Sequence, residues 1–277
     1  MTEKLIAFQG AHGAYSEEAL RHYFGNDVEG LPCESFAEVF DMITKGHATH
    51  GILPVENSLA GSVIQAYDEL LKHSLSIQAE VILRIEHNLL AMPGVGIDDV
   101  KTVLSHPQAL AQCHENIVKY GLKPEPYYDT AGAAKFISES QDVTACAIAS
   151  HLSAETYNLE IIKSDFEDEE FNFTRFFVLG NDNLPFNEHG IYKTSIAFLV
   201  EHQPQSLVKV LEEFSSRYIN MSKIESRPSR EGPWRYMFLV DIMGNENQPL
   251  IAEALNAVKA QTPLLRVLGS YQAASLN

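Results

Sequence analysis

Short apolar runs alternate with helical patterns over residues 4–180 of the chain. Runs such as residues 5–9, 51–55 and 143–149 have the length of buried strands, and each comes before a segment with apolar residues at helical spacing. A regular alternation of strands and helices predicts a largely parallel sheet with helices on both of its faces. The fold class of this part is therefore α/β.

Several helices in this part are predicted from apolar spacing and from their end residues. Three of them cover residues 16–24, 61–73 and 107–121, the last with proline in its first turn and glycine at its end. Residues 76–92 form a long extended stretch instead, which we interpret as a crossover between two lobes. A second crossover is expected near residues 158–165.

The pattern changes after an Asn-rich stretch, which we interpret as a linker at residues 182–193. Residues 194–271 then follow the order strand, helix, strand, strand, helix, strand, with amphipathic helices at 205–218 and 249–260. This order predicts a ferredoxin-like domain. The remaining residues, 1–181, form the first domain.

The net charge limits the classes of partner that the protein can bind. The 277 residues carry a formal charge of −17, which disfavours nucleic acid and anionic membrane surfaces. No apolar stretch reaches membrane-spanning length, and the N-terminus has no signal-peptide pattern, so we expect a cytoplasmic protein. Cys33, Cys113 and Cys146 are widely spaced and indicate reduced core thiols, and no His or Cys spacing indicates a metal site.

Polar clusters follow several of the predicted strands. They read QGAHGAYS at residues 9–16, PVENSLAGS at 54–62, SHPQAL at 105–110 and DTAGAA at 129–134. Each has a structural explanation as a glycine turn or a helix cap, and His106 is better explained as a cap than as a catalyst. Ligands of open α/β sheets, however, bind beyond the carboxyl ends of the strands. The shared placement of these clusters therefore favours a binding site.

Thr174 and Arg175 stand at the start of an apolar strand that ends at Gly180. Burying an arginine without an anion is costly, so Arg175 needs solvent or a negative partner. One candidate partner is the acidic run DFEDEE at residues 165–170, and the other is an anionic ligand. The segment alone leaves both explanations open.

Several of these segments together resemble the prephenate dehydratase family. In chain order they are GAYSE (13–17), PVENS (54–58), SHPQ (105–108), DTA (129–131) and NFTRF (172–176). In addition, IESRP at 224–228 resembles the phenylalanine-binding motif of the ACT regulatory domain that is attached to those enzymes. The resemblance covers nearly the whole chain. It implies a two-lobed, doubly wound catalytic domain, similar to periplasmic binding proteins, and a C-terminal ferredoxin-like βαββαβ ACT domain.

The resemblance implies a decarboxylating dehydration of prephenate to phenylpyruvate, water and CO₂ in L-phenylalanine biosynthesis, without a cofactor. Thr174 is then the catalytic residue that hydrogen-bonds the leaving hydroxyl, Arg175 binds a substrate carboxylate, and Phe176 keeps the site dry. Glu56 either orders Asn57 or Arg175 or acts as an acid with a raised pKa, and we favour the ordering role. The acidic run then becomes a solvated loop. The other expected substrate-binding residues are Asn57, Ser58, Ser105, Gln108, Tyr15 and Ser16.

For the second domain the resemblance implies that L-phenylalanine binds between paired ACT domains, which requires a homodimer or homotetramer. The expected effector-binding residues are Glu225, Ser226, Arg227, Pro228, Ser206, Leu207, Asn220 and Met221. Gln205 departs from the family, which usually has glycine at this position. A side chain there can crowd the effector or change the start of the helix.

Three alternatives compete with this interpretation. An arogenate dehydratase would make L-phenylalanine directly, and nothing in the sequence distinguishes the two substrates. A solute-binding protein has a similar two-lobed cleft, but the absence of a signal peptide and the Thr174–Arg175 pair favour an enzyme. A purely regulatory amino-acid sensor would not need Thr174. Because no segment precedes residue 4 that could hold a chorismate mutase, we expect a monofunctional enzyme.

Overall fold

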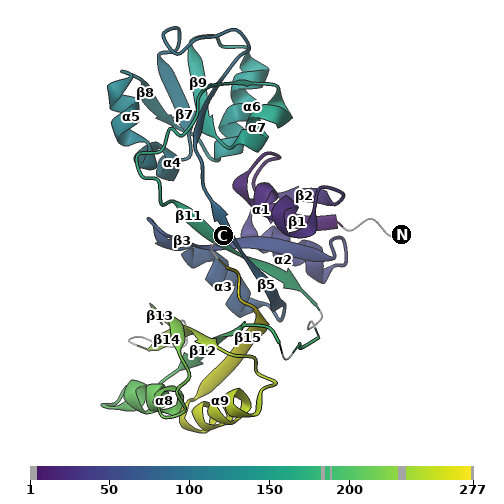
Figure 1. The fold of residues 1–277 in the computed structure, drawn as a ribbon, viewed down its shortest axis with the longest axis vertical. Helices are drawn as coiled ribbons and strands as arrows, with labels where there is room; N and C mark the ends of the chain where they lie inside the picture. The colour runs from purple at the N-terminus through teal and green to yellow at the C-terminus, as the bar shows by residue number, and fades with distance from the viewer. Residues whose placement is uncertain (1–4, 182–184, 188, 230–234, 276–277) are drawn as a thin grey trace. The chain divides into compact units, whose positions relative to one another are not determined.

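The computed structural model describes residues 5–181, 185–187, 189–229 and 235–275. The chain forms two compact units (Figure 1). The first contains the residues up to 73 together with 81–177, and the second contains 74–80 together with the residues from 178 onward. Part of the predicted linker, residues 182–184 and 188, lies outside the described residues.

The first unit begins with a lobe that we call the first lobe. The strands of its sheet run in the order β11 (Phe173–Gly180), β3 (His50–Asn57), β1 (Leu5–Gln9) and β2 (Glu29–Cys33), with the short β4 (Gly61–Ser62) beside β3. Its helices are α1 (Tyr15–Phe24), α2 (Phe36–Thr44) and α3 (Ile64–Lys72). Strand β1 is parallel to both β2 and β3, as the strand–helix alternation predicts. Strand β2 was not predicted, because Gly30 and Pro32 interrupt its apolar pattern.

The second lobe has a mixed sheet of five strands. Their order is β10 (Glu160–Lys163), β6 (Asn88–Ala91), β9 (Ala145–Ala149), β7 (Thr102–Ser105) and β8 (Lys123–Pro126). Its helices are α4 (Pro107–Gln112), α5 (His114–Lys119), α6 (Thr130–Ser140) and α7 (His151–Tyr157). Strand β7 is parallel to its neighbours β8 and β9, whereas β6 is antiparallel to β9 and β10. The two-lobed α/β architecture is therefore confirmed.

Three sequence predictions for this unit need correction. The single helix predicted at 107–121 is two helices, because Cys113 between them has a non-helical backbone (φ −118°, ψ 17°). The helix predicted from residue 61 begins only at Ile64, because the preceding residues form β4. The chain leaves β5 (Ser76–Arg84) for the second lobe at 85–87 and returns at 164–172. This return lies later than the predicted 158–165, because β10 extends the second sheet.

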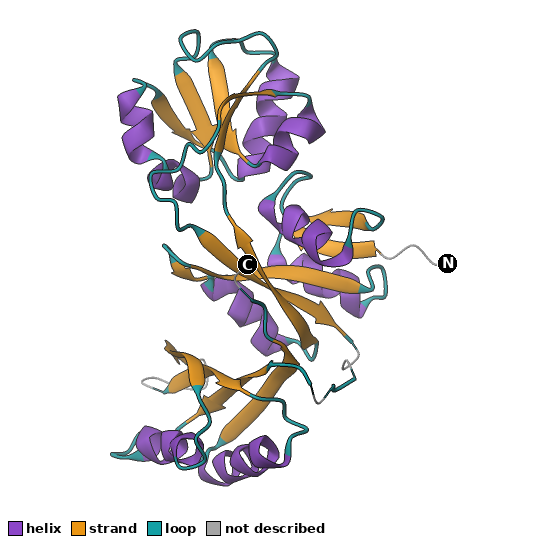
Figure 2. Ribbon diagram, in the orientation of Figure 1, coloured by secondary structure: helices purple, strands orange, loops and turns teal. Residues whose placement is uncertain are grey.

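The second unit has the predicted βαββαβ order. Its elements are β12 (Tyr192–Leu199), α8 (Ser206–Ser215), β13 (Met221–Pro228), β14 (Tyr236–Met243), α9 (Pro249–Gln261) and β15 (Leu264–Gln272). The antiparallel sheet has the order β13-β14-β12-β15, and both helices cover the same face (Figure 2). Their apolar sides pack on the sheet through a core that includes Val210, Phe214 and Val258. The beginning of β5 joins this sheet, where Ala79 pairs with Gln272.

Gln205 occupies the position before α8 with a left-handed backbone (φ 69°, ψ −8°). This conformation favours glycine, because a Cβ atom clashes with the backbone there. Replacing Gln205 by glycine is expected to raise the free energy of unfolding by up to about 1 kcal/mol. Urea denaturation measures this change. The exposed Gln203 of the same loop is not among the left-handed residues, so Gln203→Gly is expected to be neutral or destabilising. Equal effects of the two substitutions would contradict the prediction.

Candidate active site

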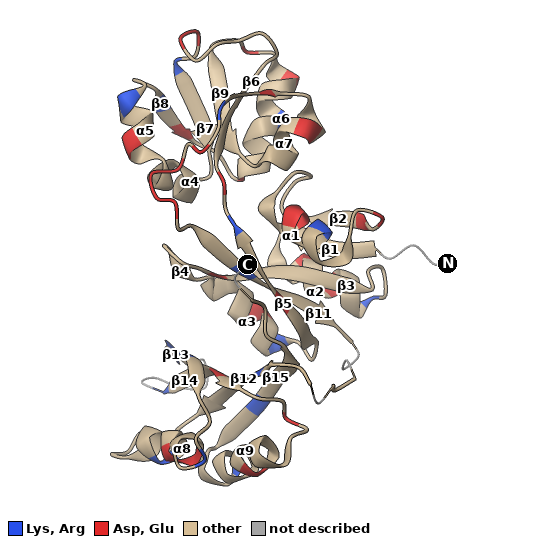
Figure 3. Cartoon of the chain, viewed as in Figure 1, with Lys and Arg blue, Asp and Glu red and all other residues tan. Residues whose placement is uncertain are grey.

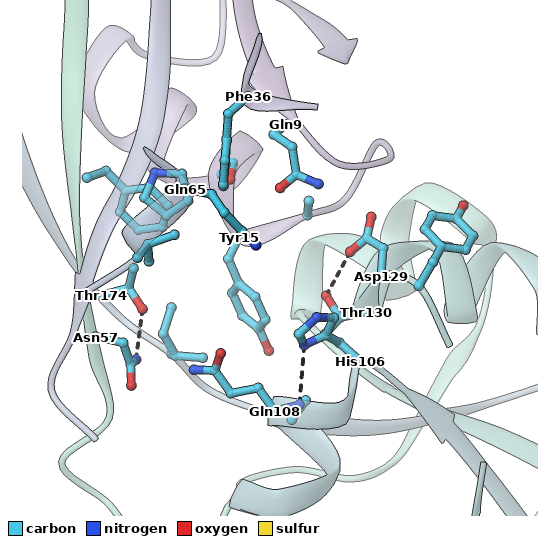
Figure 4. Close-up of a pocket in the computed structure, with 18 of the residues that line it drawn as sticks. Gln9, Tyr15, Phe36, Asn57, Gln65, His106, Gln108, Asp129, Thr130 and Thr174 are labelled. Atoms are coloured by element: carbon cyan, nitrogen blue, oxygen red, sulfur yellow. Dashed lines mark hydrogen bonds between the residues drawn. The ribbon is translucent and has the colours of Figure 1, made fainter. Parts of the chain in front are cut away.

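A cavity of about 600 Å³ lies in the first unit and is lined by residues of both lobes (Figure 4). This volume is in the range of small-molecule sites. Six of the predicted substrate-site residues line it: Tyr15, Ser16, Asn57, Gln108, Thr174 and Phe176. They come from α1, β3, α4 and β11, so the tertiary structure brings together segments that are far apart in the sequence.

Five helices begin at this cavity. The N-cap residues of α1, α2, α3, α4 and α6 all line it, and they are Ala14, Ser35, Val63, His106 and Asp129. His106 is a cap, as predicted, because its ring accepts a hydrogen bond from the Gln108 N–H. The positive end of each helix dipole therefore points at the cavity.

Acidic side chains, but no lysine or arginine, are among the described residues that line the cavity. The acidic ones include Glu34, Glu69 and Asp129. The whole chain carries a net charge of −17, and acidic residues are spread over both units (Figure 3). An anion in the cavity therefore depends on the helix N-termini and on neutral hydrogen-bond donors.

Asn57 holds the hydroxyl of Thr174. The Oδ1 atom of Asn57 accepts hydrogen bonds from the backbone N–H groups of Leu59 (3.1 Å) and Ala60 (2.9 Å). This fixes the orientation of the amide, so Nδ2 donates to Thr174 Oγ1 at 3.0 Å. Because Oγ1 accepts from Asn57, the hydroxyl proton of Thr174 can be donated to a ligand in the cavity.

Arg175 lies on the opposite face of β11 from the cavity. Side chains alternate along a strand, so Thr174 and Phe176 line the cavity while Arg175 does not. The Arg175 guanidinium lies over the Phe177 ring, 4.8 Å from its centroid, and its Nη1 atom is 3.5 Å from Glu56 Oε2. This alternation argues against the predicted direct contact between Arg175 and the substrate.

Two predicted serines are also absent from the cavity lining. Ser105 is fully buried and donates to the Ile148 carbonyl at 2.6 Å. Ser58 donates to the Phe171 carbonyl at 2.8 Å and accepts from the Phe173 N–H at 2.9 Å. Both hydroxyls therefore connect chain segments that frame the cavity.

The acidic run at 165–170 was predicted to be a solvated loop, but two of its side chains are bound by other parts of the first unit. Asp168 accepts hydrogen bonds from the backbone N–H groups of Glu115 (2.9 Å) and Asn116 (3.1 Å) at the start of α5. Glu167 is buried and accepts from the His87 N–H at 2.8 Å. These contacts anchor the return segment, and Glu56 is a negative partner of Arg175.

Several polar residues of this region were not predicted, among them Gln112, His87 and Asn172. Gln112 and His87 line the cavity, and Asn172 is buried and accepts from Asn57 Nδ2 at 2.8 Å. Gln112 lies one turn after Gln108 on α4, and Asn172 begins the NFTRF segment, so both could have been found. No feature of the sequence singles out His87.

The predicted effector residues lie in two segments of the second unit. Ser206 and Leu207 begin α8, and Met221 to Pro228 form β13, which is the edge strand of the described sheet. Asn220 immediately precedes β13. Glu225 on this strand is paired with Lys223 at 3.3 Å.

Features typical of metal sites and membrane spans do not occur among the described residues. In this part of the chain no group of three or more His, Cys, Asp or Glu side chains is arranged to hold a metal ion. None of the described helices combines the length and apolar character that a membrane span requires. All three cysteines are buried free thiols, and burial raises the pKa of Cys33 to about 11.

Comparison with solved structures gives several neighbours over nearly the whole chain, and two of them match with the same TM-score. Prephenate dehydratase from Arthrobacter aurescens, solved in complex with L-Phe, superposes with a TM-score of 0.90 at 29% identity and covers 98% of this chain and 90% of that one. The second, described as GqqA, a novel type of quorum quenching acylase, has a TM-score of 0.90 at 34% identity and covers 98% of both chains.

Comparison with known sequences gives the family. An arogenate dehydratase/prephenate dehydratase of Arabidopsis thaliana, described as chloroplastic, is 42% identical over 96% of this chain and 72% of its own length. Arogenate dehydratase 2 of Petunia hybrida is 41% identical over 96% of this chain and 71% of its own. The prephenate dehydratase family model matches residues 6–184, and the ACT domain model matches 194–260. The chain therefore belongs to the prephenate dehydratase family and carries a C-terminal ACT domain.

Proposed function

We propose that the protein converts prephenate to phenylpyruvate, water and CO₂ and that Thr174 is its catalytic residue. The observation that carries this proposal is the Asn57–Thr174 hydrogen bond at the wall of the cavity. This hydrogen bond leaves the proton of the Thr174 hydroxyl to be donated to the leaving group of a bound substrate. Membership of the prephenate dehydratase family supports the reaction itself.

The reaction needs little more than positioning and a hydrogen-bond donor. The bond between the ring and its carboxylate breaks, its electron pair enters the ring, and the ring hydroxyl leaves with one proton from water. Thr174 stabilises the departing oxygen through a hydrogen bond, which contributes about 2–4 kcal/mol in comparable sites. The two carboxylates of the substrate interact with the helix N-termini around the cavity. Phe176 and Ile85 supply an apolar wall, which disfavours solvation of the departing carboxylate.

Turnover of the purified protein tests this proposal. Phenylpyruvate is expected to form from prephenate in the absence of added metal or cofactor. Arogenate, tested in parallel, would give L-phenylalanine instead, and the names of the plant relatives make it the alternative substrate. We propose prephenate as the preferred substrate, so a higher kcat/KM for arogenate would overturn that preference. Lack of turnover of both substrates would overturn the dehydratase function.

The name of one structural neighbour suggests acylase activity as a second candidate. A threonine nucleophile needs a base that removes its proton. The group that contacts Thr174 Oγ1 here is the Asn57 amide nitrogen, which donates a hydrogen bond and does not accept a proton. This geometry favours the dehydratase.

Arg175 is proposed to act on the substrate only indirectly, through the strand that carries Thr174. Arg175→Gln is expected to lower the free energy of unfolding by about 1–2 kcal/mol, because Glu56 loses a partner but remains partly solvated. The kcat/KM for prephenate is expected to fall less than about tenfold, because Arg175 does not contact the substrate. Loss of a direct buried charge contact would cost about 2–5 kcal/mol. Steady-state kinetics and urea denaturation measure the two effects. A loss of kcat/KM greater than a hundredfold would restore direct carboxylate binding by Arg175.

L-Phenylalanine is proposed as the allosteric effector, bound by the predicted residues on α8 and β13. The L-Phe complex of the Arthrobacter relative supports this choice. Arg227→Ala is expected to raise the L-phenylalanine concentration for half-maximal response at least about fivefold, which corresponds to about 1 kcal/mol. The change in kcat without effector is expected to be smaller. Assays with increasing L-phenylalanine measure both, with the exposed Lys209→Ala as control. An unchanged response in Arg227→Ala would place the effector site elsewhere.

The domain bounds, the oligomeric state and the location are part of the same proposal. The catalytic domain is proposed to span 1–181, the linker 182–193 and the ACT domain 194–271. A homodimer or homotetramer is proposed, because an effector bound between ACT domains needs two copies. Light scattering of the purified protein tests this, and a monomer would contradict it. We propose a cytoplasmic location, although the named plant relatives include a chloroplastic protein.

A further inference from the structure

We propose that His87, held as its Nε2–H tautomer, is a positioning residue for the dehydration. It aligns Gln112 and Asn172 and, through them, the Asn57–Thr174 pair. This inference rests on the proposed dehydratase function. His87 lies in the first crossover between the two lobes, outside every motif that led to the family.

The ring of His87 is fixed on both of its nitrogen atoms. It is almost fully buried, with 2% of its surface exposed. Its Nε2 atom lies 2.9 Å from Gln112 Oε1, and its Nδ1 atom lies 2.7 Å from the Tyr15 hydroxyl. The Tyr15 ring meets the imidazole edge-on, with ring centroids 5.5 Å apart. Glu167 holds the backbone of His87 by accepting its N–H at 2.8 Å.

The direction of each hydrogen bond in this network follows from the backbone. The N–H groups of Leu59 and Ala60 make Asn57 Oδ1 an acceptor, so Asn57 Nδ2 is the donor to Asn172 Oδ1 at 2.8 Å. Asn172 Nδ2 must then donate to Gln112 Oε1, at 3.2 Å. The oxygen of Gln112 is therefore an acceptor.

The donor and acceptor directions of these hydrogen bonds determine the tautomer of His87. Because Gln112 Oε1 accepts, His87 Nε2 must carry the hydrogen. Burial lowers the pKa of His87, so its ring is neutral near neutral pH and Nδ1 keeps a lone pair. Nδ1 therefore accepts from the Tyr15 hydroxyl. Burial also raises the pKa of Tyr15 well above its usual value, so the phenol keeps its proton. In the opposite tautomer Tyr15 would donate to the Glu86 carbonyl instead, which is 2.9 Å away.

The network crosses between the lobes along both connecting segments. Tyr15 belongs to α1 and Asn57 to β3 of the first lobe, whereas Gln112 belongs to α4 of the second. His87 and Asn172 lie on the first and the return crossover. The Asn57 amide is held by Asn172 and by Gln112, whose Nε2 atom lies 3.5 Å from Asn57 Oδ1. The position of the second lobe therefore affects how the Thr174 hydroxyl is held. Such an effect on orientation changes kcat more than KM.

Three substitutions of His87 separate its two contacts. His87→Gln can place an amide donor near the position of Nε2 and restore the contact to Gln112. His87→Asn is shorter and reaches only the position of Nδ1, so it keeps an acceptor for Tyr15 and loses Gln112. His87→Leu removes both contacts. We expect kcat for prephenate to fall about 10–100-fold in His87→Asn and His87→Leu, but less than about fivefold in His87→Gln, with KM within about threefold.

The exposed His47→Gln is the matched control and is expected to have wild-type kcat. Equal losses in His87→Gln and His87→Leu would mean that the histidine serves packing alone and would overturn the inference. Wild-type kcat in His87→Asn would overturn it as well.

Imidazole ¹⁵N NMR of the full-length wild-type protein tests the tautomer without any turnover. Near neutral pH, His87 is expected to have a protonated Nε2 and an unprotonated Nδ1. His87→Gln identifies its signals by their absence. The Nδ1–H tautomer or an imidazolium would overturn the inference. A wild-type protein that shows the expected tautomer but no turnover of prephenate would instead overturn the proposed function and, with it, the positioning role.

Discussion

Replacing Thr174 by valine is expected to lower kcat for prephenate by about 10²–10³-fold, the usual effect of removing one donor that stabilises a developing negative charge. Valine keeps the shape of the side chain and removes only the hydroxyl. KM is expected to change less than about threefold, because the hydrogen bond to the leaving oxygen strengthens mainly in the transition state. Steady-state kinetics of phenylpyruvate formation measure both constants.

The fold is expected to survive the substitution of Thr174. Asn57 Nδ2 keeps its bonds to Asn172 Oδ1 at 2.8 Å and to the Phe173 carbonyl at 3.2 Å, so its amide is still satisfied. Thr174→Ser retains the hydroxyl and is the matched control, for which we expect kcat within about tenfold of wild type. If the Thr174→Val protein turned over prephenate as fast as the Thr174→Ser protein, the hydroxyl would have no catalytic role.

Replacing Asn57 by aspartate is the second prediction with a large expected effect. The new carboxylate still accepts from the N–H groups of Leu59 and Ala60, but it cannot donate to Thr174 Oγ1 or Asn172 Oδ1. The hydroxyl of Thr174 would then turn to donate to the carboxylate. Its proton would no longer be available for a hydrogen bond to the substrate. We expect kcat to fall by about 10²–10³-fold and the free energy of unfolding to fall by about 2–3 kcal/mol.

The pH dependence of this variant gives a sharper test. Burial raises the pKa of a carboxyl group, and the protonated acid can again donate a hydrogen bond to Thr174. The kcat of Asn57→Asp relative to wild type is therefore expected to rise as the pH falls towards the raised pKa. Asn26→Asp, at an exposed position, is expected to follow the wild-type profile. A ratio that stays constant with pH would show that the amide is not needed as a donor.

The helix N-termini explain how a protein with a net charge of −17 can bind a dianion. Their N-cap residues line the cavity in both lobes, at Ala14, Ser35 and Val63 in the first and at His106 and Asp129 in the second. Dipoles contribute partial positive charge that needs no compensating buried anion. Arginine in the same place would be expected to pair with nearby carboxylates such as Glu34 or Glu69 when the site is empty.

Local patterns predicted most elements of the fold. The strand over Leu5–Gln9, the extended crossover and the βαββαβ order of the second unit are set by apolar periodicity and caps, which are properties of neighbouring residues. Some of the errors occur where strand pairing overrides local preference. Strand β2 forms despite Gly30 and Pro32 because its backbone pairs with β1 along five residues.

The sequence by itself determined the family, the α/β class and the segments that carry chemistry, because those depend on residue type and order. Only the tertiary structure decided which face of a strand each residue occupies. Thr174 and Arg175 are adjacent in the chain, yet the alternation of β11 directs the first to the cavity and the second to Glu56 and Phe177. It also decided that His87, far from every motif, contacts Gln112 and Tyr15, because contacts between a crossover and the two lobes depend on how the lobes pack.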